Sequence, residues 1–225
     1  MAGEAAVDAI QGVGVEIDAE AVVITSDIPL RVLSSAVLHG GLGEARAIVN
    51  LRVPRNHPCD DPPAMLGDFA RRRRLPQPYV GLLTGARTEL AATAVATAHG
   101  ICALAVTTVG LSNRFASGRD PMAVCAPSTI NTIVVVDADP SPAALVNAVI
   151  TITEAKVLAL HQAGIRGPDG GAVSGTSTDA VVIAATGRGR RTPFGGPASE
   201  LGWTIASAVS RALTEGIRGW REPEP

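Results

Sequence analysis

The chain has 225 residues, which is long enough for one well-buried domain. Hydrophobic residues make up 46% of the chain and charged residues 18%, which excludes disorder as an overall description. The net charge of −2 argues against a nucleic-acid-binding protein, because such proteins normally carry a basic stripe. The one basic run, at positions 71–74, predicts a solvated helix face.

The first part of the chain favours an antiparallel meander followed by a helix. Residues 15–25 alternate and then become continuously apolar, which predicts a strand or a hairpin. Residues 30–38 and 45–53 predict two further strands, with a glycine-rich turn at 40–43 between them. Asp60 and Asp61 precede two prolines, a pattern typical of a helix start, and this helix should end before Pro76.

The middle of the chain predicts strands with one unresolved element. Residues 79–83 predict a short strand that ends in Thr84 and Gly85. Residues 90–98 fit a helix by their alanine content and a strand by their alternating Thr and Val, and the pattern does not decide between them. Residues 101–109 and 130–136 are apolar and β-branched, which predicts strands buried on both faces. The connection at 110–127 is longer than most, and such loops often carry function.

The last part predicts two helices around one more strand. Ser141 and Pro142 begin the clearest helix, and Gly164 ends it. A polar turn then leads into a strand at 180–185, a basic glycine-rich loop at 187–196 and a final helix at 197–217.

We find no repeat or linker, so we predict a single α/β (α+β) domain over residues 1–225, with a mixed β-sheet and packed helices. Residues 1–14 are expected to be a disordered N-terminus and residues 219–225 a C-terminal tail.

Several patterns bear on location and partners. The N-terminus lacks the pattern of a signal peptide, and the apolar runs at 101–106 and 133–136 are too short to cross a bilayer. The three cysteines have the spacing of neither a disulfide framework nor a metal clip. We therefore expect a cytoplasmic protein that binds neither nucleic acid nor a membrane. The oligomeric state stays open, a homo-oligomer included.

A hydroxyl-rich turn is the first candidate for chemistry. Thr176, Ser177, Thr178 and Asp179 are four consecutive hydrogen-bonding side chains just before a predicted strand. They could offer a nucleophile, backbone donors and an acid/base group together. The alternative is a polar turn whose side chains bond to their own backbone.

Lys156 is the second candidate, because it is the only lysine among 19 Lys and Arg residues. A site that keeps lysine indicates a need for a compact ammonium group. Glu154 is two residues away, a spacing that does not bring the two side chains together on a helix. The alternative is a partly buried lysine that pairs structurally with a carboxylate.

The remaining candidates are one histidine and two asparagines. His57 lies in a loop between a predicted strand and a helix, where catalytic residues are frequent, although a single histidine is more often structural. Asn113 and Asn131 lie near strand ends and could bind amide groups, since each side chain both donates and accepts. The alternative for both is a turn asparagine.

Six short strings in this order resemble the adenosylcobinamide amidohydrolase family, from about Ser34 to Trp203. They are Asn56-His57, Gly81-Leu82-Leu83-Thr84-Gly85, Gly110-Leu111-Ser112-Asn113, Thr129-Ile130-Asn131, Thr153-Glu154-Ala155-Lys156 and Gly175-Thr176-Ser177-Thr178-Asp179-Ala180. The chain departs from the family pattern at His39, Ala86, Thr88, Arg114 and Ser128. The changes at His39 and Arg114 bear on which corrinoid is preferred more than on the fold.

The resemblance implies an enzyme that removes aminopropanol from (adenosyl)cobinamide and gives (adenosyl)cobyric acid, a salvage step in the prokaryotic cytoplasm. The corrinoid is then the substrate and no cofactor is required. Two alternatives remain: a non-catalytic corrinoid-binding module, and an amidohydrolase that acts on another amide. The arginines at 188, 190 and 191 also leave room for a phosphorylated ligand.

Our hypothesis for the site follows from these residues. Water or Thr176 is the nucleophile, Glu154 or His57 is the base, and Lys156 stabilises the oxyanion or protonates the leaving nitrogen. Asp179 orients the base or a water molecule. The expected substrate-binding residues are Asn56, Thr84, Gly85, Asn113, Asn131 and Thr178. A metal-assisted alternative would use His57 and Asp179 as ligands, but no ligand spacing supports it. The hypothesis requires Lys156 and the hydroxyl-rich turn to line one cavity.

Overall fold

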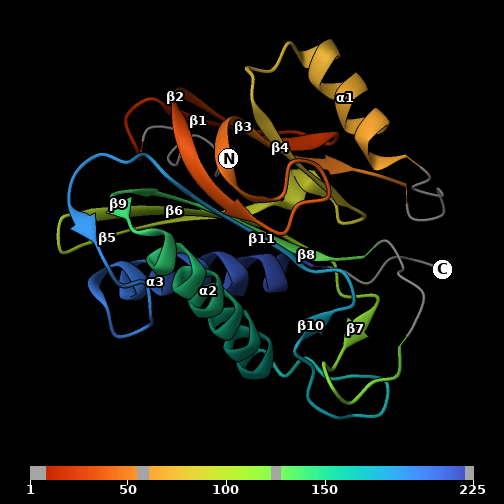
Figure 1. The fold of residues 1–225 in the computed structure, drawn as a ribbon. Coiled ribbons are helices and arrows are strands. Elements are labelled where there is room, and N and C mark those ends of the chain that lie inside the picture. The colour runs from red at the N-terminus through yellow and green to blue at the C-terminus, as the bar shows by residue number, and fades with distance from the viewer. Residues whose placement is uncertain (1–8, 55–60, 123–127, 221–225) are drawn as a thin grey trace.

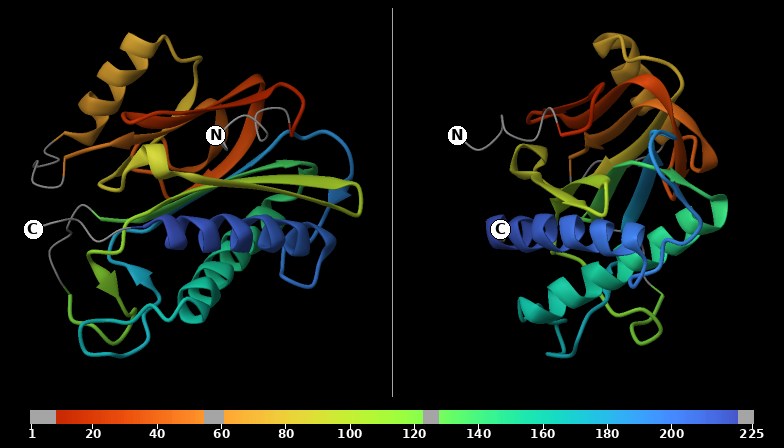
Figure 2. Two further views of the ribbon diagram at one scale, coloured as in Figure 1. Left: turned by 180° about the vertical axis from the view of Figure 1, so that it is seen from behind. Right: turned by 90° about the vertical axis from the view of Figure 1, so that its left-hand side faces the viewer.

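The computed structural model describes residues 9–54, 61–122 and 128–220. In these residues eight strands form one mixed sheet in the order β4-β3-β2-β11-β8-β6-β5, and β1 pairs with β2 outside this path. Helices α2 and α3 cover one face of the sheet, and α1 lies over β3 and β4 (Figures 1 and 2). The strands of the large sheet are β1 (Val13–Ile17), β2 (Ala21–Ser34), β3 (Gly41–Arg52), β4 (Tyr79–Thr84), β5 (Ala92–Ala98), β6 (Ile101–Val109), β8 (Ile130–Asp137) and β11 (Ala180–Ala185). The predicted mixed α/β architecture is confirmed.

The N-terminal meander is confirmed, with two changes of detail. Strands β1, β2 and β3 pair antiparallel in succession. The predicted strand at 30–38 is the second half of β2, which continues through a register shift between Thr25 and Leu30. Part of the predicted glycine turn is strand, because β3 already begins at Gly41. At the N-terminus Ile10 is only 2% exposed, so packing begins ahead of β1.

The three helices begin where local capping side chains place them. Asp61 accepts a hydrogen bond from the Ala64 amide at 3.0 Å to start α1 (Pro62–Arg73). Ser141 does the same for α2 (Pro142–Gln162), as predicted. Helix α3 (Glu200–Gly219) begins a few residues later than predicted, because its N-cap is Ser199.

For residues 90–98 the sequence pattern did not decide between helix and strand. The structure shows strand β5 there, preceded by a short 3-10 helix η1 (Thr88–Leu90). Strand β5 pairs with β6 along its whole length. His99 and Gly100 join the two strands and both have positive φ, the geometry that tight hairpin turns require. Pairing with β6 therefore overrides the helix propensity of the alanines.

Strands β6, β8 and β11 are buried on both faces, as predicted for β6 and β8. Val134 and Ile183 face α2 and α3, whereas the neighbouring Val135 and Val182 belong to a second cluster inside the curve of the sheet. By length and composition alone α2 could cross a membrane. In this fold, however, Leu145 and other residues of α2 are buried against the rest of the protein. Figure 2 shows the curvature of the sheet.

The arginines at positions 71–74 are a solvated helix face, as predicted. They lie in and after the last turn of α1, and Arg73 pairs with Glu16 at 2.6 Å and with Asp18 at 2.9 Å. Burial, the largest single influence, would raise the pKa of Asp18, but hydrogen bonds from the Ala21 amide and from Arg73 together hold that pKa below its usual value. The ion pairs of Arg73 thus connect α1 to the N-terminal meander.

Candidate active site

Lys156 and the hydroxyl-rich turn meet. Lys156 lies on the buried side of α2 and is 9% exposed. Its Nζ donates to Asp179 Oδ2 at 2.5 Å, although the two residues are 23 positions apart. Both side chains are 11% exposed, so this ion pair is largely removed from water. The two segments are therefore in contact, and the common cavity that the hypothesis places there stays a prediction.

Asp179 is the centre of this arrangement, because each of its oxygens accepts two hydrogen bonds. Oδ2 accepts from Lys156 and from the Thr176 amide at 3.1 Å. Oδ1 accepts from the Thr176 hydroxyl at 2.5 Å and from the Ile130 amide at 3.0 Å. The carboxylate thus joins α2, the turn and the start of β8, and the proton of the Thr176 hydroxyl points at it.

Gly175 makes this close approach possible. It precedes Thr176 in β10 (Gly175–Thr176). A Cβ added there would lie 2.0 Å from Asp179 Oδ2 and 2.7 Å from Lys156 Nζ. The ion pair therefore occupies the space that a side chain would need.

Replacing Gly175 by alanine should displace the pair and destabilise the protein by about 1–3 kcal/mol, the usual cost of overpacking. Urea denaturation measures the loss, and turnover should fall with it. Gly43→Ala is the matched control, since Gly43 is also in a strand and has nothing within 4 Å of the added Cβ. Equal stability of the two variants would contradict the geometry.

The rest of the turn is hydrogen-bonded to the loops beside it. Asn113 Nδ2 donates to the Ser177 hydroxyl at 2.9 Å. The Thr178 hydroxyl donates to the Ser128 carbonyl at 3.2 Å. Strand β10 also pairs with β7 (Arg114–Phe115). Both Asn113 and Thr178, predicted as substrate-binding residues, therefore lie at the turn and are half-buried.

Asn131 belongs to a buried chain of polar side chains. It is 1% exposed, and its Nδ2 donates to Asn50 Oδ1 at 2.8 Å and to the Leu83 carbonyl at 2.9 Å. Its Oδ1 accepts from Thr129 at 3.1 Å. Strands β4 and β8 are not neighbours in the sheet, so these hydrogen bonds connect two parts of the curved sheet that are distant in its strand order. The side-chain amide of Asn131 is thus hydrogen-bonded to groups of the protein itself.

Asn131→Ala should therefore act on stability. It leaves Asn50 Oδ1 and the Leu83 carbonyl without their donor, which costs about 1–3 kcal/mol for a buried group. The free energy of unfolding in urea measures this loss. A variant with wild-type stability and a strongly raised KM for the corrinoid would instead make Asn131 a substrate contact.

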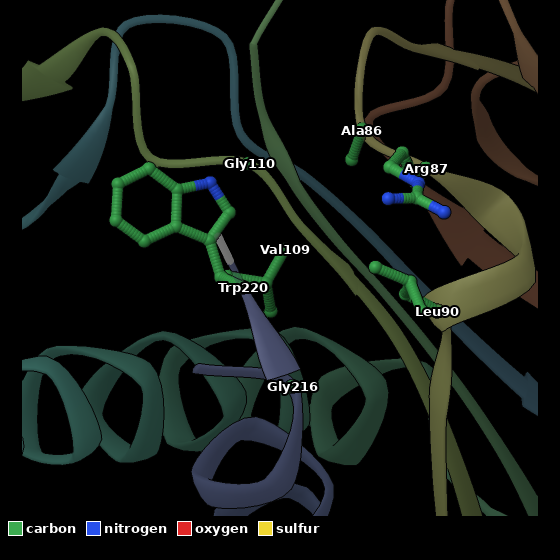
Figure 3. A pocket seen from close by; sticks show the side chains of 7 residues that line it. All are labelled: Ala86, Arg87, Leu90, Val109, Gly110, Gly216 and Trp220. Carbon is green, nitrogen blue, oxygen red and sulfur yellow. The ribbon is translucent and has the colours of Figure 1, made fainter. Parts of the chain in front are cut away.

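Thr84 and Gly85 lie at the end of β4 and directly follow Leu83, whose carbonyl accepts the hydrogen bond from Asn131. Thr84 is 1% exposed, and its Oγ1 accepts from the Ala86 amide at 3.0 Å. Next to them is a cavity of about 30 Å³, large enough for water but not for a corrin ring. Its lining residues, shown in Figure 3, are Ala86, Arg87, Leu90, Val109, Gly110, Gly216 and Trp220. The Gly110 amide donates to the Thr129 carbonyl at 3.0 Å, so the cavity borders the polar chain.

The sequence matches the family described as adenosylcobinamide amidohydrolase over residues 6–225. The chain belongs to this family. A Methanosarcina mazei protein named adenosylcobinamide amidohydrolase is 30% identical over 196 residues, which are 81% of this chain and 88% of that protein. An uncharacterized protein of Methanocaldococcus jannaschii is 36% identical over 92 residues, which are 40% of this chain and 35% of that protein.

Two solved structures resemble this member of the adenosylcobinamide amidohydrolase family loosely. A protein from Pyrococcus horikoshii OT3 aligns with a TM-score of 0.48 and 10% identity, over 92% of this chain and 83% of that one. An L-aminopeptidase D-Ala-esterase/amidase from Ochrobactrum anthropi aligns with a TM-score of 0.38 and 12% identity, over the same shares. At these scores neither bears on the site of the amidohydrolase.

Among the remaining predicted residues of the amidohydrolase, Glu154 does not join this cluster. Glu154 is exposed on α2, away from the buried Lys156. Asn56 and His57 lie outside the described residues. Within residues 9–54, 61–122 and 128–220, no group of three His, Cys, Asp or Glu side chains could hold a metal ion.

Sequence reasoning missed two residues of the cluster. Asn50 lies within an apolar predicted strand, and a single amide side chain in that run is the only feature of the sequence that indicates it. Gly175 precedes the hydroxyl-rich turn and has no predicted role of its own, and only the packing shows that its missing side chain admits the ion pair.

Proposed function

We propose that this chain hydrolyses the amide bond that joins aminopropanol to the corrinoid in (adenosyl)cobinamide. The products are aminopropanol and (adenosyl)cobyric acid. The match to the adenosylcobinamide amidohydrolase family over residues 6–225 carries this proposal. The setting is corrinoid salvage in the prokaryotic cytoplasm, with a corrinoid as the partner and water as the only co-substrate.

Thr176, Asp179 and Lys156 form the proposed catalytic unit. The Thr176 hydroxyl attacks the amide carbon while Asp179 Oδ1, which it already contacts at 2.5 Å, takes its proton. Asp179 then gives this proton to the nitrogen of the departing aminopropanol, and the C–N bond breaks. Water hydrolyses the resulting threonine ester by the same route in reverse.

Lys156 takes a different role from the one expected. Its ammonium is bound to Asp179 Oδ2, so it serves as a positioning residue that holds the carboxylate toward Thr176. Asp179 replaces Glu154 or His57 as the proposed base, because Asp179 contacts the nucleophile. Glu154 is exposed on α2, and His57 lies outside the described residues. Asn113 is proposed to hold a corrin side chain from the neighbouring loop, with Thr84, Gly85 and Thr178 nearby.

Release of free aminopropanol tests the proposal directly. The protein is incubated with adenosylcobinamide, and both products are measured by mass spectrometry. Corrinoid binding without release would make the chain a binding module. Release from other amides but not from adenosylcobinamide would make it an amidohydrolase of another substrate class.

A further inference from the structure

His39 lies in the connection between β2 and β3, and its imidazole is held in one orientation. Its Nδ1 is 2.8 Å from the Tyr79 carbonyl oxygen. A carbonyl oxygen only accepts hydrogen bonds, so Nδ1 carries the proton and donates it. The ring also meets the Tyr79 ring edge-on, with centroids 5.7 Å apart. In the neutral imidazole, Nε2 on the other side of the ring is therefore the atom with the free lone pair.

The backbone on either side keeps this imidazole in place. Leu38 exchanges two hydrogen bonds with Gly81 of β4, at 3.1 Å and 3.0 Å. His39 itself has a φ of 54°, a region that residues other than glycine adopt rarely. Its side chain is exposed, so a ligand can reach Nε2. A histidine that donates Nδ1–H to a backbone carbonyl and leaves Nε2 accessible has the arrangement typical of a metal-ligating histidine.

His39 borders an open groove of about 470 Å³ beside α1 and the start of β4. Gly67 of α1 lines the groove and has nothing within 4 Å of the position of a Cβ, so a flat ligand can approach the helix closely. Arg74 and Gln77 line the same groove and are exposed, so their N–H groups can donate to a ligand. The groove thus combines a nitrogen that can bind a metal with donors for carbonyl oxygens.

The chain path places His39 near the proposed catalytic unit. Ser35 Oγ accepts a hydrogen bond from the Val181 amide at 3.0 Å, and Val181 follows Asp179 by two residues. Four residues lead from Ser35 to His39, a span of at most about 14 Å for an extended chain. In a corrinoid the aminopropanol amide is carried on an arm at the rim of the ring, well away from the cobalt at its centre. A corrinoid bound through its cobalt at His39 can therefore extend this arm toward Thr176.

We propose that His39 Nε2 is an axial ligand of the corrinoid cobalt, on the face opposite the adenosyl group. This inference rests on the proposed function, which makes a corrinoid the ligand. Cobinamide lacks the nucleotide base of a complete cobamide, so water occupies its lower axial position. The Co–O bond to that water breaks, the Nε2 lone pair forms a Co–N bond, and cobalt keeps its oxidation state. Arg74 and Gln77 then donate to carbonyl oxygens of the amide arms around the ring.

Electron paramagnetic resonance of cob(II)inamide bound to the protein tests the ligand directly. An axial nitrogen splits each cobalt line into a triplet, whereas an axial water oxygen does not. The wild-type complex should show the triplet, and the complex of His39→Asn should lose it. Asparagine is the suitable replacement because it tolerates the positive φ of this position, so the connection should keep its course.

His99→Asn is the matched control, because His99 is also exposed, also has a φ of 54° and lies in the β5–β6 hairpin. This variant should keep the triplet. Release of aminopropanol from adenosylcobinamide is measured with the same proteins. His39→Asn should raise KM by about 10-fold or more, since even the outer partners of a metal ligand contribute that much to affinity. Its kcat should change little, because the cobalt ligand contributes binding and not chemistry.

The two measurements separate the inference from the proposed function. A wild-type complex without the triplet, or a triplet that survives in His39→Asn, would overturn the inference, and release of aminopropanol would still support the proposed function. A triplet that depends on His39, together with no release from adenosylcobinamide, would support the cobalt ligand and make the chain a corrinoid-binding module.

Discussion

Asp179→Asn should lower the turnover of adenosylcobinamide by about 10³-fold, within the usual range for loss of a general base. Asparagine keeps the size of the side chain but cannot take the proton of the Thr176 hydroxyl, which Asp179 Oδ1 contacts at 2.5 Å. Steady-state release of aminopropanol measures the effect. Asp169→Asn is the control, since Asp169 is a 60% exposed carboxylate on the neighbouring loop and should keep wild-type turnover.

The same substitution should also cost stability, which must be separated from the chemistry. It leaves the Lys156 ammonium buried without a carboxylate, and breaking a buried ion pair costs up to about 3–5 kcal/mol. Urea denaturation shows whether the variant is folded under assay conditions. A folded Asp179→Asn variant with wild-type turnover would remove Asp179 as the base. If Glu154→Gln were inactive in the same assay, Glu154 would take that role.

Lys156→Arg should lower turnover by at least about 10²-fold, the loss that a displacement of about 1 Å can cause. The charge is kept, but a guanidinium is larger, and Lys156 Nζ is already 2.7 Å from the position of a Gly175 Cβ. Arginine would therefore push Asp179 away from Thr176. Turnover is compared with corrinoid binding, followed by the change in corrinoid absorbance, and binding should persist.

Gln162→Arg is the control for an added arginine on α2, because Gln162 is exposed at the end of the same helix. It should behave as wild type. Wild-type turnover in Lys156→Arg would contradict the proposal that Asp179 needs a compact ammonium group at this position to be held toward Thr176.

Local elements could be predicted where their signals are local. The starts of α1 and α2 depend on Asp61 and Ser141, each of which bonds an amide three residues later. Strand β5 could not be decided, because the choice between helix and strand depends on its pairing with β6. The long β2 was divided in two by the sequence pattern, since its register shift is visible only in the paired sheet.

The amino-acid sequence by itself determined the family, the mixed α/β class and the two segments that carry the proposed chemistry. The only lysine and the hydroxyl-rich turn stand out because residue identity alone distinguishes them. Only the tertiary structure decided that Lys156 pairs with Asp179 while Glu154 faces outward, and that Asn131 binds Asn50. These contacts join residues distant in the chain, so they depend on how α2 docks on the sheet and how the sheet curves, which spacing along the chain does not encode.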